Sequence, residues 1–324
     1  MLFRRPCYYD KFSCTADKCA DNCCIGWEIC IDAETCSYYK SIDSAFGERL
    51  KKNICEGDAP SFILQNERCP FLNESNLCDI ILNLGKDALC QICRDHPRWF
   101  EWYGNEKEGG IGLSCEEGAR LILTEEGFAD FFENEIDDEP DEDFDDYAYR
   151  FLLSVRERIF DILCDNGFSF AERANKILEL SAKAEAELSG EEKRSFSEFG
   201  FNAELKKALP ILSQTEPIDE KWTSEFEKLK AATKELIPDK KDSEYLTRLF
   251  AYFIWRYFLT SVFDYRVTEK VQLALFSVTV IFALYNIKDN KSFDSLLKSA
   301  VLYSKQMEYS EENLDIFFLS EAAK

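Results

Sequence analysis

The chain has 324 residues, a formal net charge of −23 and 46% hydrophobic residues. A chain of this length usually exceeds what one compact core supports, so we expect two domains. The negative charge disfavours binding to nucleic acid, because phosphate binding requires lysine and arginine at the surface. It suits a soluble, cytoplasmic protein, or one whose partner presents positive groups such as lysine side chains.

Neither a secretory signal nor a transmembrane segment is expected. Two arginines near the N-terminus are followed by no apolar run. The most apolar stretch, 271–285, is shorter than the ~20 residues that cross a bilayer. The stretch 246–265 is long enough, but it contains Arg248, Arg256 and Asp264. We interpret both stretches as buried core helices.

Cysteine is concentrated in the first part of the chain. Thirteen of the 14 cysteines lie within residues 1–115, and five of them lie between Cys14 and Cys30. A large chain without an export signal does not need the disulfides that stabilise small secreted domains. Thiolates are soft, anionic ligands for zinc and for iron–sulfur clusters, and a site needs about four of them. We therefore favour metal ligation, with an exported, disulfide-linked protein as an alternative.

Residues 1–132 are rich in turn residues and predict only short helices, over 33–40, 46–53, 77–87 and 116–124. Asp32 is the expected N-cap of the first helix. The glycines of 109–112 predict a flexible turn before a short strand or bend. Residues 133–146 carry ten acidic groups in fourteen positions. Because like charges repel, we interpret this segment as a solvated interdomain linker. The alternative is that its negative charge attracts a partner that presents lysine side chains.

The rest of the chain predicts an α-helical bundle. Apolar residues recur at helical spacing over 147–164, 169–188, 195–212, 219–236, 243–265, 268–287 and 292–307. Thr268 is the expected N-cap of the most apolar helix. The predicted fold is therefore mostly α: an irregular cysteine-rich metal-binding domain (1–132), an acidic linker (133–146) and an α-helical domain (147–324).

The cysteine spacing allows one or two metal sites. Cys14, Cys19, Cys23 and Cys24 offer four thiols on one loop, and the vicinal pair points to opposite faces if the segment is extended. Cys90-x2-Cys93 is a common half-site spacing, and Cys69 with Cys78 could supply another pair. A radical-enzyme motif, Cys-x3-Cys-x2-Cys, is excluded because its third position is Gly26. No Gly-x-Gly-x-x-Gly follows a strand, so a Rossmann-type methyltransferase is not expected.

The ordered motifs over about residues 8–125 resemble the flagellin lysine-N-methylase family, within a larger group of cysteine-rich zinc- or iron-chelating proteins. The helical second half matches in character and length only. The motifs are Phe12-x-Cys14-x4-Cys19-x3-Cys23-Cys24-x-Gly26-Trp27-x-Ile29, Cys69-Pro70-Phe71-Leu72, Leu77-Cys78, Leu84-Gly85, Cys93 before Pro97-Arg98, and Leu113-Ser114-Cys115 with Arg120.

This resemblance implies transfer of a methyl group from S-adenosylmethionine to lysine side chains of flagellin in the cytoplasm. It also implies a 4Fe-4S iron–sulfur cluster, with zinc as the alternative metal. Carried over by position, the metal ligands are Cys14, Cys19, Cys23, Cys24, Cys69, Cys78, Cys93 and Cys115. The other cysteines, which we expect to behave as small buried hydrophobes, are Cys7, Cys30, Cys36, Cys55, Cys90 and Cys164. Cys90 lies where no family ligand is expected.

Lysine methylation requires a neutral amine, so the site must remove a proton from the lysine or lower its pKa. The candidate catalytic residues are His96, Tyr103 and Glu116. Arg94 and Arg98 could bind the carboxylate of the cofactor, and Trp27 could stack on its adenine or contact its sulfonium. For each of these, local packing or pairing is the competing explanation. The alternative function is a non-catalytic four-cysteine metal protein that acts as a protein-interaction module.

Overall fold

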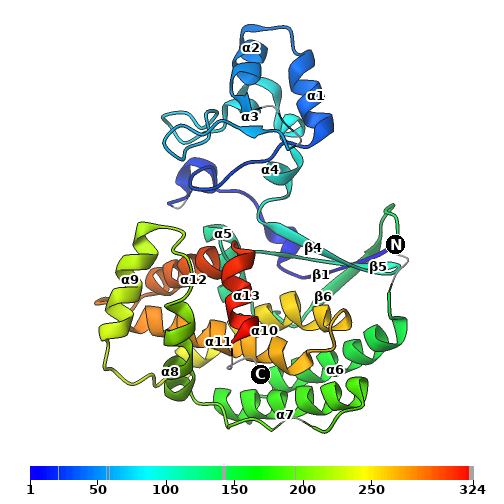
Figure 1. The fold of residues 1–324 in the computed structure, drawn as a ribbon, viewed down its shortest axis with the longest axis vertical. Helices are drawn as coiled ribbons and strands as arrows, with labels where there is room; N and C mark the ends of the chain where they lie inside the picture. The colour runs from blue at the N-terminus through cyan, green and yellow to red at the C-terminus, as the bar shows by residue number, and fades with distance from the viewer. Residues whose placement is uncertain (21, 56, 58, 141–143, 194, 321–324) are drawn as a thin grey trace. The chain divides into compact units, whose positions relative to one another are not determined.

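The computed structural model describes residues 1–320 except 21, 56, 58, 141–143 and 194 (Figure 1). The chain folds into two compact units. Unit 1 comprises residues 1–12, 100–114 and 118–324, and unit 2 comprises residues 13–99 and 115–117. The chain therefore begins in unit 1, forms unit 2 and then returns to unit 1.

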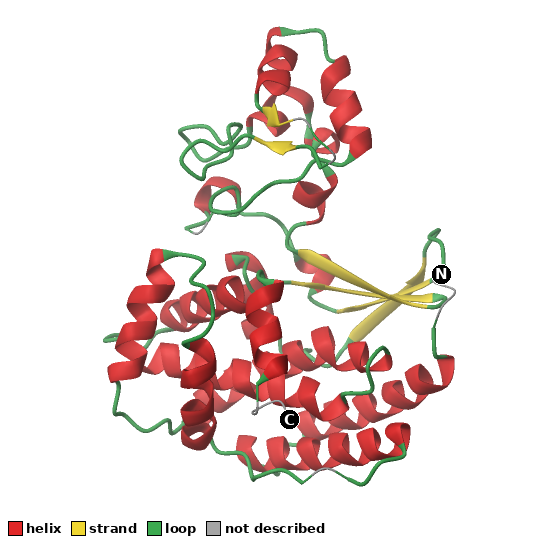
Figure 2. Cartoon of the chain, viewed as in Figure 1, coloured by secondary structure: helices red, strands yellow, loops and turns green. Residues whose placement is uncertain are grey.

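Unit 1 contains a four-stranded sheet with the strand order β4–β5–β1–β6 (Figure 2). The strands are β1 (Leu2–Pro6), β4 (Arg98–Tyr103), β5 (Glu106–Ile111) and β6 (Phe131–Glu135). β1 pairs in parallel with β5 and antiparallel with β6, so that Phe3 lies opposite both Lys107 and Asn134. β1 is thus an inner strand of the sheet, and the first residues of the chain belong to unit 1.

The glycines of β5 are part of this sheet and do not form the predicted flexible turn. Gly109 lies against the ring of Phe3, where a Cβ would stand 2.8 Å from the nearest ring carbon. Its carbonyl accepts a hydrogen bond from Trp255 Nε1 at 3.1 Å. A side chain at this position would therefore clash with the buried ring that covers the strand.

The remainder of unit 1 is helical. Its elements are η1 (Tyr9–Lys11), α5 (Glu116–Thr124), α6 (Asp146–Cys164), α7 (Phe170–Ser189), α8 (Phe201–Leu212), α9 (Glu220–Ala231), α10 (Lys240–Tyr257), η4 (Phe258–Val262), α11 (Val267–Asn286), α12 (Phe293–Met307) and α13 (Glu311–Leu319). The predicted mostly-α fold is confirmed.

The centre of unit 1 is α11. This helix is long and apolar enough to cross a membrane, but 94% of its most apolar window is buried inside the protein. α7, α8, α10 and α12 all pack against it. A helix that is hydrophobic on every side is stable in water only when neighbours surround it, so α11 is the core helix that the sequence predicts.

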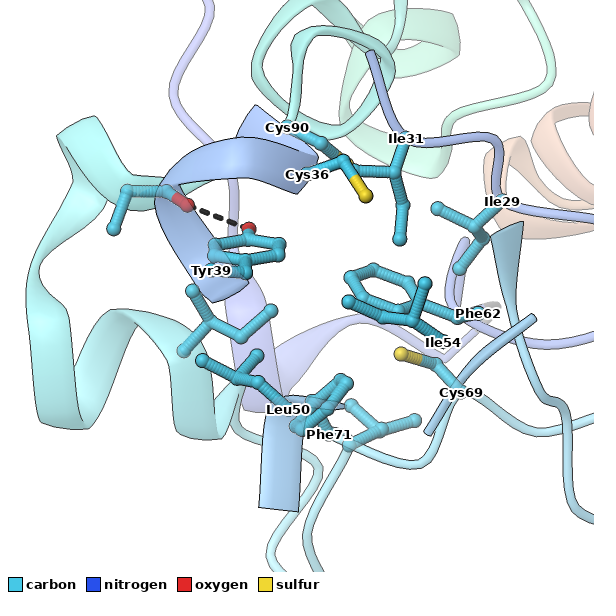
Figure 3. Packing of buried hydrophobic residues seen from close by; sticks show 13 residues of the cluster. Ile29, Ile31, Cys36, Tyr39, Leu50, Ile54, Phe62, Cys69, Phe71 and Cys90 are labelled. Carbon is cyan, nitrogen blue, oxygen red and sulfur yellow. Dashed lines mark hydrogen bonds between the residues drawn. The ribbon is translucent and has the colours of Figure 1, made fainter. Parts of the chain in front are cut away.

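Unit 2 is small and has short elements: η2 (Ala16–Lys18), α1 (Ala33–Ser41), α2 (Ala45–Lys52), β2 (Ile54–Cys55), β3 (Ser61–Phe62), α3 (Asp79–Leu84), η3 (Lys86–Ala88) and α4 (Gln91–Asp95). Phe62 and Phe71 pack edge to face at the centre of its core (Figure 3). Tyr39 stacks on Phe62 and donates a hydrogen bond to Ala88 O at 2.6 Å. Three cysteines, Cys36, Cys69 and Cys90, belong to the same buried cluster.

Several element boundaries differ from those that the sequence predicts. α3 ends at Leu84, and the positive φ of 90° at the next residue, Gly85, breaks the predicted helix 77–87. α8 begins at Phe201, six residues later than predicted, and α10 ends at Tyr257 before a 3-10 turn. Thr268 lies inside α11, and the N-cap position is Arg266. By contrast, Asp32 caps α1 as predicted, accepting a hydrogen bond from Thr35 N at 2.9 Å.

The division of the chain also differs from the predicted domains 1–132, 133–146 and 147–324. Residues 133–135 belong to β6, and 136–140 lead from it toward α6 in the same unit. The acidic segment therefore does not join the two units; its residues 141–143 lie outside the described part of the chain. The charge on β6 is accommodated because Glu133 pairs with Arg4 of β1 at 2.6 Å.

Candidate metal centre

Five cysteines of unit 2, besides Cys36, belong to its hydrophobic core or pack against it. Cys69 and Cys90 are buried within the core, at 6% and 1% exposure, and Cys24, Cys78 and Cys93 pack against it. They come from four separate segments, so the fold of unit 2 is what brings them together. We call these residues the inner thiols: Cys24, Cys69, Cys78, Cys90 and Cys93.

The inner thiols are close enough to affect one another's ionisation. Burial, together with the neighbouring charges of Cys78 and Cys90, raises the pKa of Cys69 to about 11. A hydrogen bond with Cys90 raises the pKa of Cys93, and burial and the charges of Cys90, Cys24 and Cys69 add to this effect. Several negative charges are unfavourable together in a buried group of thiols. A bound cation stabilises thiolates in such an environment.

Burial raises the pKa of Cys69 and of Cys78, and the nearby backbone amides act in the opposite direction. The backbones of three inner thiols are held by the turns that follow them. The amide nitrogens of Leu72, Leu82 and Arg94 donate hydrogen bonds to the carbonyl oxygens of Cys69, Cys78 and Cys90.

Cys23 lies beside the inner thiols and contacts His96. Hydrogen bonds with Cys24 and then with His96 lower the pKa of Cys23. The Trp27 indole donates a hydrogen bond to Cys23 O, and its ring centroid lies 5.9 Å from that of His96. Three sequence-predicted residues, Cys23, Trp27 and His96, thus form one contiguous group.

Two of the other predicted ligands of unit 2, Cys19 and Cys115, lie near Glu116. Glu116 Oε2 accepts a hydrogen bond from Ala20 N at 2.7 Å and lies 3.5 Å from Cys19 Sγ. Cys115 precedes Glu116, and Cys14 Sγ accepts a hydrogen bond from Ala16 N at 3.4 Å. Cys14 is exposed, whereas Cys19 and Cys115 are partly buried.

The cysteines outside the family motif differ in environment. Cys7, Cys36 and Cys90 are buried, as expected. Cys36 packs in the core of unit 2, and Cys7 donates a hydrogen bond to Gly127 O at 3.1 Å in unit 1. Cys30, Cys55 and Cys164 are exposed, so the prediction that they are small buried hydrophobes is wrong. No disulfide joins any of the 14 cysteines, all of which lie in the described part of the chain.

Cysteine thiolates are the ligands that zinc ions and iron–sulfur clusters prefer, and the inner thiols offer donors of this type. Within the described residues, no group of three or more His, Cys, Asp or Glu side chains is already arranged in coordination geometry. A metal would therefore have to draw the inner thiols together.

The remaining predicted residues are less suited to the roles assigned to them. Tyr103 belongs to unit 1, is 2% exposed and stacks between Tyr149 and Phe263. Burial raises its pKa well above the ordinary value, which makes its phenolate a costly species. Arg94 on α4 donates a hydrogen bond to Gln91 Oε1 at 3.0 Å, and Arg98 begins β4.

Unit 1 contains a pocket of about 780 Å³ next to α8, within the size range of small-molecule sites. Its polar lining includes Glu204, Lys207 and Gln272. None of these is a residue that the sequence singles out.

Comparison with known proteins places the chain in a family. The chain is 31% identical over 128 residues to the flagellar biosynthetic protein FliU of Salmonella muenchen, a match that covers 37% of this chain and 76% of that protein. The chain belongs to the flagellin lysine-N-methylase family. Family members named lysine-N-methylase from Salmonella typhimurium and Salmonella choleraesuis are 31% and 33% identical over 128 residues.

The match with these two lysine-N-methylases spans 32% of their length, about a third. No protein-family model matches the chain. No solved structure matches it either.

Proposed function

We propose that this protein is a cytoplasmic, S-adenosylmethionine-dependent protein-lysine methyltransferase that acts on flagellin. We further propose that the cysteines of unit 2 hold an iron–sulfur cluster. The names of the family relatives support lysine methylation. The observation that carries the metal centre is the gathering of five thiols, from separate segments, on one hydrophobic core.

The chain must supply a proton acceptor for this reaction, because a lysine ammonium has no lone pair with which to attack a methyl carbon. S-adenosylmethionine supplies the methyl group from its sulfonium. His96 is the best-placed acceptor, since its imidazole is held by Cys23 and packs beside Trp27. In this role His96 takes a proton from the lysine ammonium before the neutral amine attacks the methyl carbon and the sulfonium leaves as a thioether. Glu116 is the alternative acceptor, whereas the burial of Tyr103 disfavours it.

The test is anaerobic incubation of the purified, metal-loaded protein with methyl-labelled S-adenosylmethionine and flagellin. We expect label on flagellin lysines, and a loss of at least tenfold in rate for His96→Asn, in line with the contribution of general bases. Cys164→Ser, at an exposed position of unit 1, is the matched control and should keep full activity. No transfer by the wild-type protein at any metal loading would refute the enzyme function.

A second function is favoured by the burial of the thiols. Structural metal sites are closed to solvent, and Cys90 and Cys69 are almost fully buried. This arrangement also fits a non-catalytic metal protein whose metal organises a binding surface for other proteins. Stoichiometric zinc, together with no measurable affinity for S-adenosylmethionine, would select this function over the methyltransferase.

A further inference from the structure

The pocket beside α8 is lined by residues of unit 1 and opens to solvent. It has a volume of about 780 Å³, and its walls come from α8, α11, α13 and the segment 195–200 (Figure 1). Two of its lining residues reach solvent, because the side chain of Lys207 is 47% exposed and Leu319 is 76% exposed. A drug-sized molecule could therefore enter the pocket without disturbing the core of unit 1.

The wall formed by residues 195–200 is held in place by the rest of unit 1. The amide of Phe199 donates a hydrogen bond to Asn175 Oδ1 of α7 at 2.7 Å. The ring of Phe199 meets those of Phe170 and Phe201 at centroid distances of 5.8 and 5.0 Å. Phe199 lines the pocket, so one aromatic wall is fixed before any ligand binds. A preformed wall lowers the entropic cost of binding.

The pocket contains a carboxylate whose charge is poorly compensated. The side chain of Glu204 is 13% exposed, whereas that of its cationic partner Lys207 is 47% exposed, and the two charged groups are 3.5 Å apart. Lys207 Nζ also donates a hydrogen bond to Ser197 Oγ at 3.3 Å. Burial raises the pKa of Glu204, as expected where a negative charge is unfavourable. A positively charged group of a ligand would offset that cost.

A second polar group in the pocket wall has an unsatisfied atom. Gln272 of α11 lines the pocket, and its buried amide oxygen has no hydrogen-bond partner in the part of the chain that the structure describes. Buried polar atoms are nearly always paired, so this oxygen marks a place where a donor is missing. A ligand with an amino group would supply that donor.

We propose that this pocket is the S-adenosylmethionine site of the protein. The cofactor carries positive charge that suits Glu204 and a carboxylate that suits Lys207. Its adenine ring suits the rings of Phe196 and Phe199, and its amino group is a donor of the kind that Gln272 lacks. The inference rests on the proposed methyl transfer but requires no metal centre. It assigns cofactor binding to unit 1, in place of the sequence-predicted candidates in unit 2.

The experiment measures the binding of methyl-labelled S-adenosylmethionine to the full chain by equilibrium dialysis, without flagellin. The wild-type protein should bind one cofactor per chain. Glu204→Gln should weaken binding about tenfold, because an interaction with a charged group is lost. Ala203→Trp, at an exposed position of α8 that lines the pocket, should block binding by filling it. Glu227→Gln on α9, whose side chain is 64% exposed, is the matched control and should bind as wild type.

His96→Asn separates cofactor binding from the chemistry assigned to unit 2. This variant should bind S-adenosylmethionine with wild-type affinity although its methyl transfer is slow. A tenfold loss of affinity in His96→Asn, or wild-type affinity in either pocket variant, would overturn the assignment while leaving the methyltransferase function in place. A wild-type protein that binds no S-adenosylmethionine, with or without metal, would refute that function as well.

A second measurement on the unaltered chain covers the case in which a pocket variant does not fold. Labelled S-adenosylmethionine is cross-linked to the protein with ultraviolet light, and the labelled peptides are identified by mass spectrometry. The label should lie within residues 195–214 or in α11, and an excess of unlabelled cofactor should abolish it. Label confined to residues 13–99 would contradict the proposal.

Discussion

At the scale of single residues, unit 1 depends on a buried ion pair that its composition does not reveal. Glu108 and Arg156 are 1% and 4% exposed, and Arg156 Nη1 and Nη2 lie 2.7 and 2.5 Å from the carboxylate oxygens. The guanidinium also lies 4.2 Å from the ring centroid of Trp255. These contacts join β5 to α6 and α10. Neither partner can be removed without leaving the other charge in a site with little water.

Replacement of Glu108 by Gln should therefore lower the free energy of unfolding by about 3–5 kcal/mol, the usual cost of leaving a buried charge without its partner. Urea denaturation measures this change. The control is Asp294→Asn on α12, which breaks the exposed pair with Lys298 and should cost less than about 1 kcal/mol. Equal effects of the two substitutions would show that the Glu108 pair has no special role.

Glu204 predicts a pH dependence of stability. Burial raises the pKa of its carboxyl above the ordinary value, while Lys207, 3.5 Å away, acts in the opposite direction. Because the pKa is higher in the folded state, the protein gains stability below the unfolded pKa and loses it as pH rises through the folded pKa. Glu204→Gln should remove this loss, so that the variant's advantage in thermal denaturation appears as the pH rises above 4.5, the ordinary pKa of a glutamate. An advantage that grows toward acid pH would contradict this.

The sequence identified the cysteines of unit 2 as a group, but position along the chain does not report which of them share a core. The family motif set Cys90 apart from the predicted ligands. In the structure Cys90 belongs to the same buried cluster as Cys69, and only the packing of unit 2 supplies that information.

At the scale of elements, local signals predicted helices well and strands poorly. The cap at Asp32 and the apolar spacing of α6 and α7 depend on residues close in sequence, and these predictions are confirmed. β1 pairs with partners more than 100 residues away, which no local pattern encodes. The acidic residues of β6 predicted a linker, because so many charges are not typical of a strand. The pairing of β6 with β1 places Glu133 beside Arg4.

Deletion of residues 2–6 should consequently disrupt more than the N-terminus. Among the described strands β6 pairs with β1 alone, so its amides would lose their partners. Hydrogen exchange should accelerate across Phe131–Glu135 in the deletion variant, while the buried amides of α11 stay protected. Phe132→Ala, at a side chain that is 48% exposed, is the control and should leave exchange in β6 unchanged. Full protection of β6 in the deletion variant would contradict the observed pairing.

At the scale of the whole molecule, the two units differ in how they are stabilised. Unit 1 has a central helix surrounded by others, whereas unit 2 has a small core in which cysteines take the place of larger apolar residues. Below about 100 residues a domain buries a smaller share of its surface, and a metal often supplies the missing stability. The composition predicted two domains. Their boundaries could not be predicted from it, because the chain leaves unit 1 after its first residues and returns to it at β4 and β5.

Metal removal should therefore unfold unit 2 before unit 1. After treatment with a chelator under reducing conditions, hydrogen exchange should rise around Phe62 and Phe71 and stay slow in α11 and α10. This result follows because a ligand that binds only the folded state stabilises it by mass action. Equal exchange in unit 2 with and without chelator would show that its core is sufficient by itself.

The central claim, that the thiols of unit 2 hold a metal centre, is tested most directly by the iron, zinc and acid-labile sulfide content of protein purified anaerobically without added metal. The account predicts about four iron and four sulfide per chain, as expected of one 4Fe-4S cluster. One zinc per chain without sulfide would favour the non-catalytic function. A correctly folded protein with neither metal, and with all 14 thiols open to titration in the native state, would contradict the account.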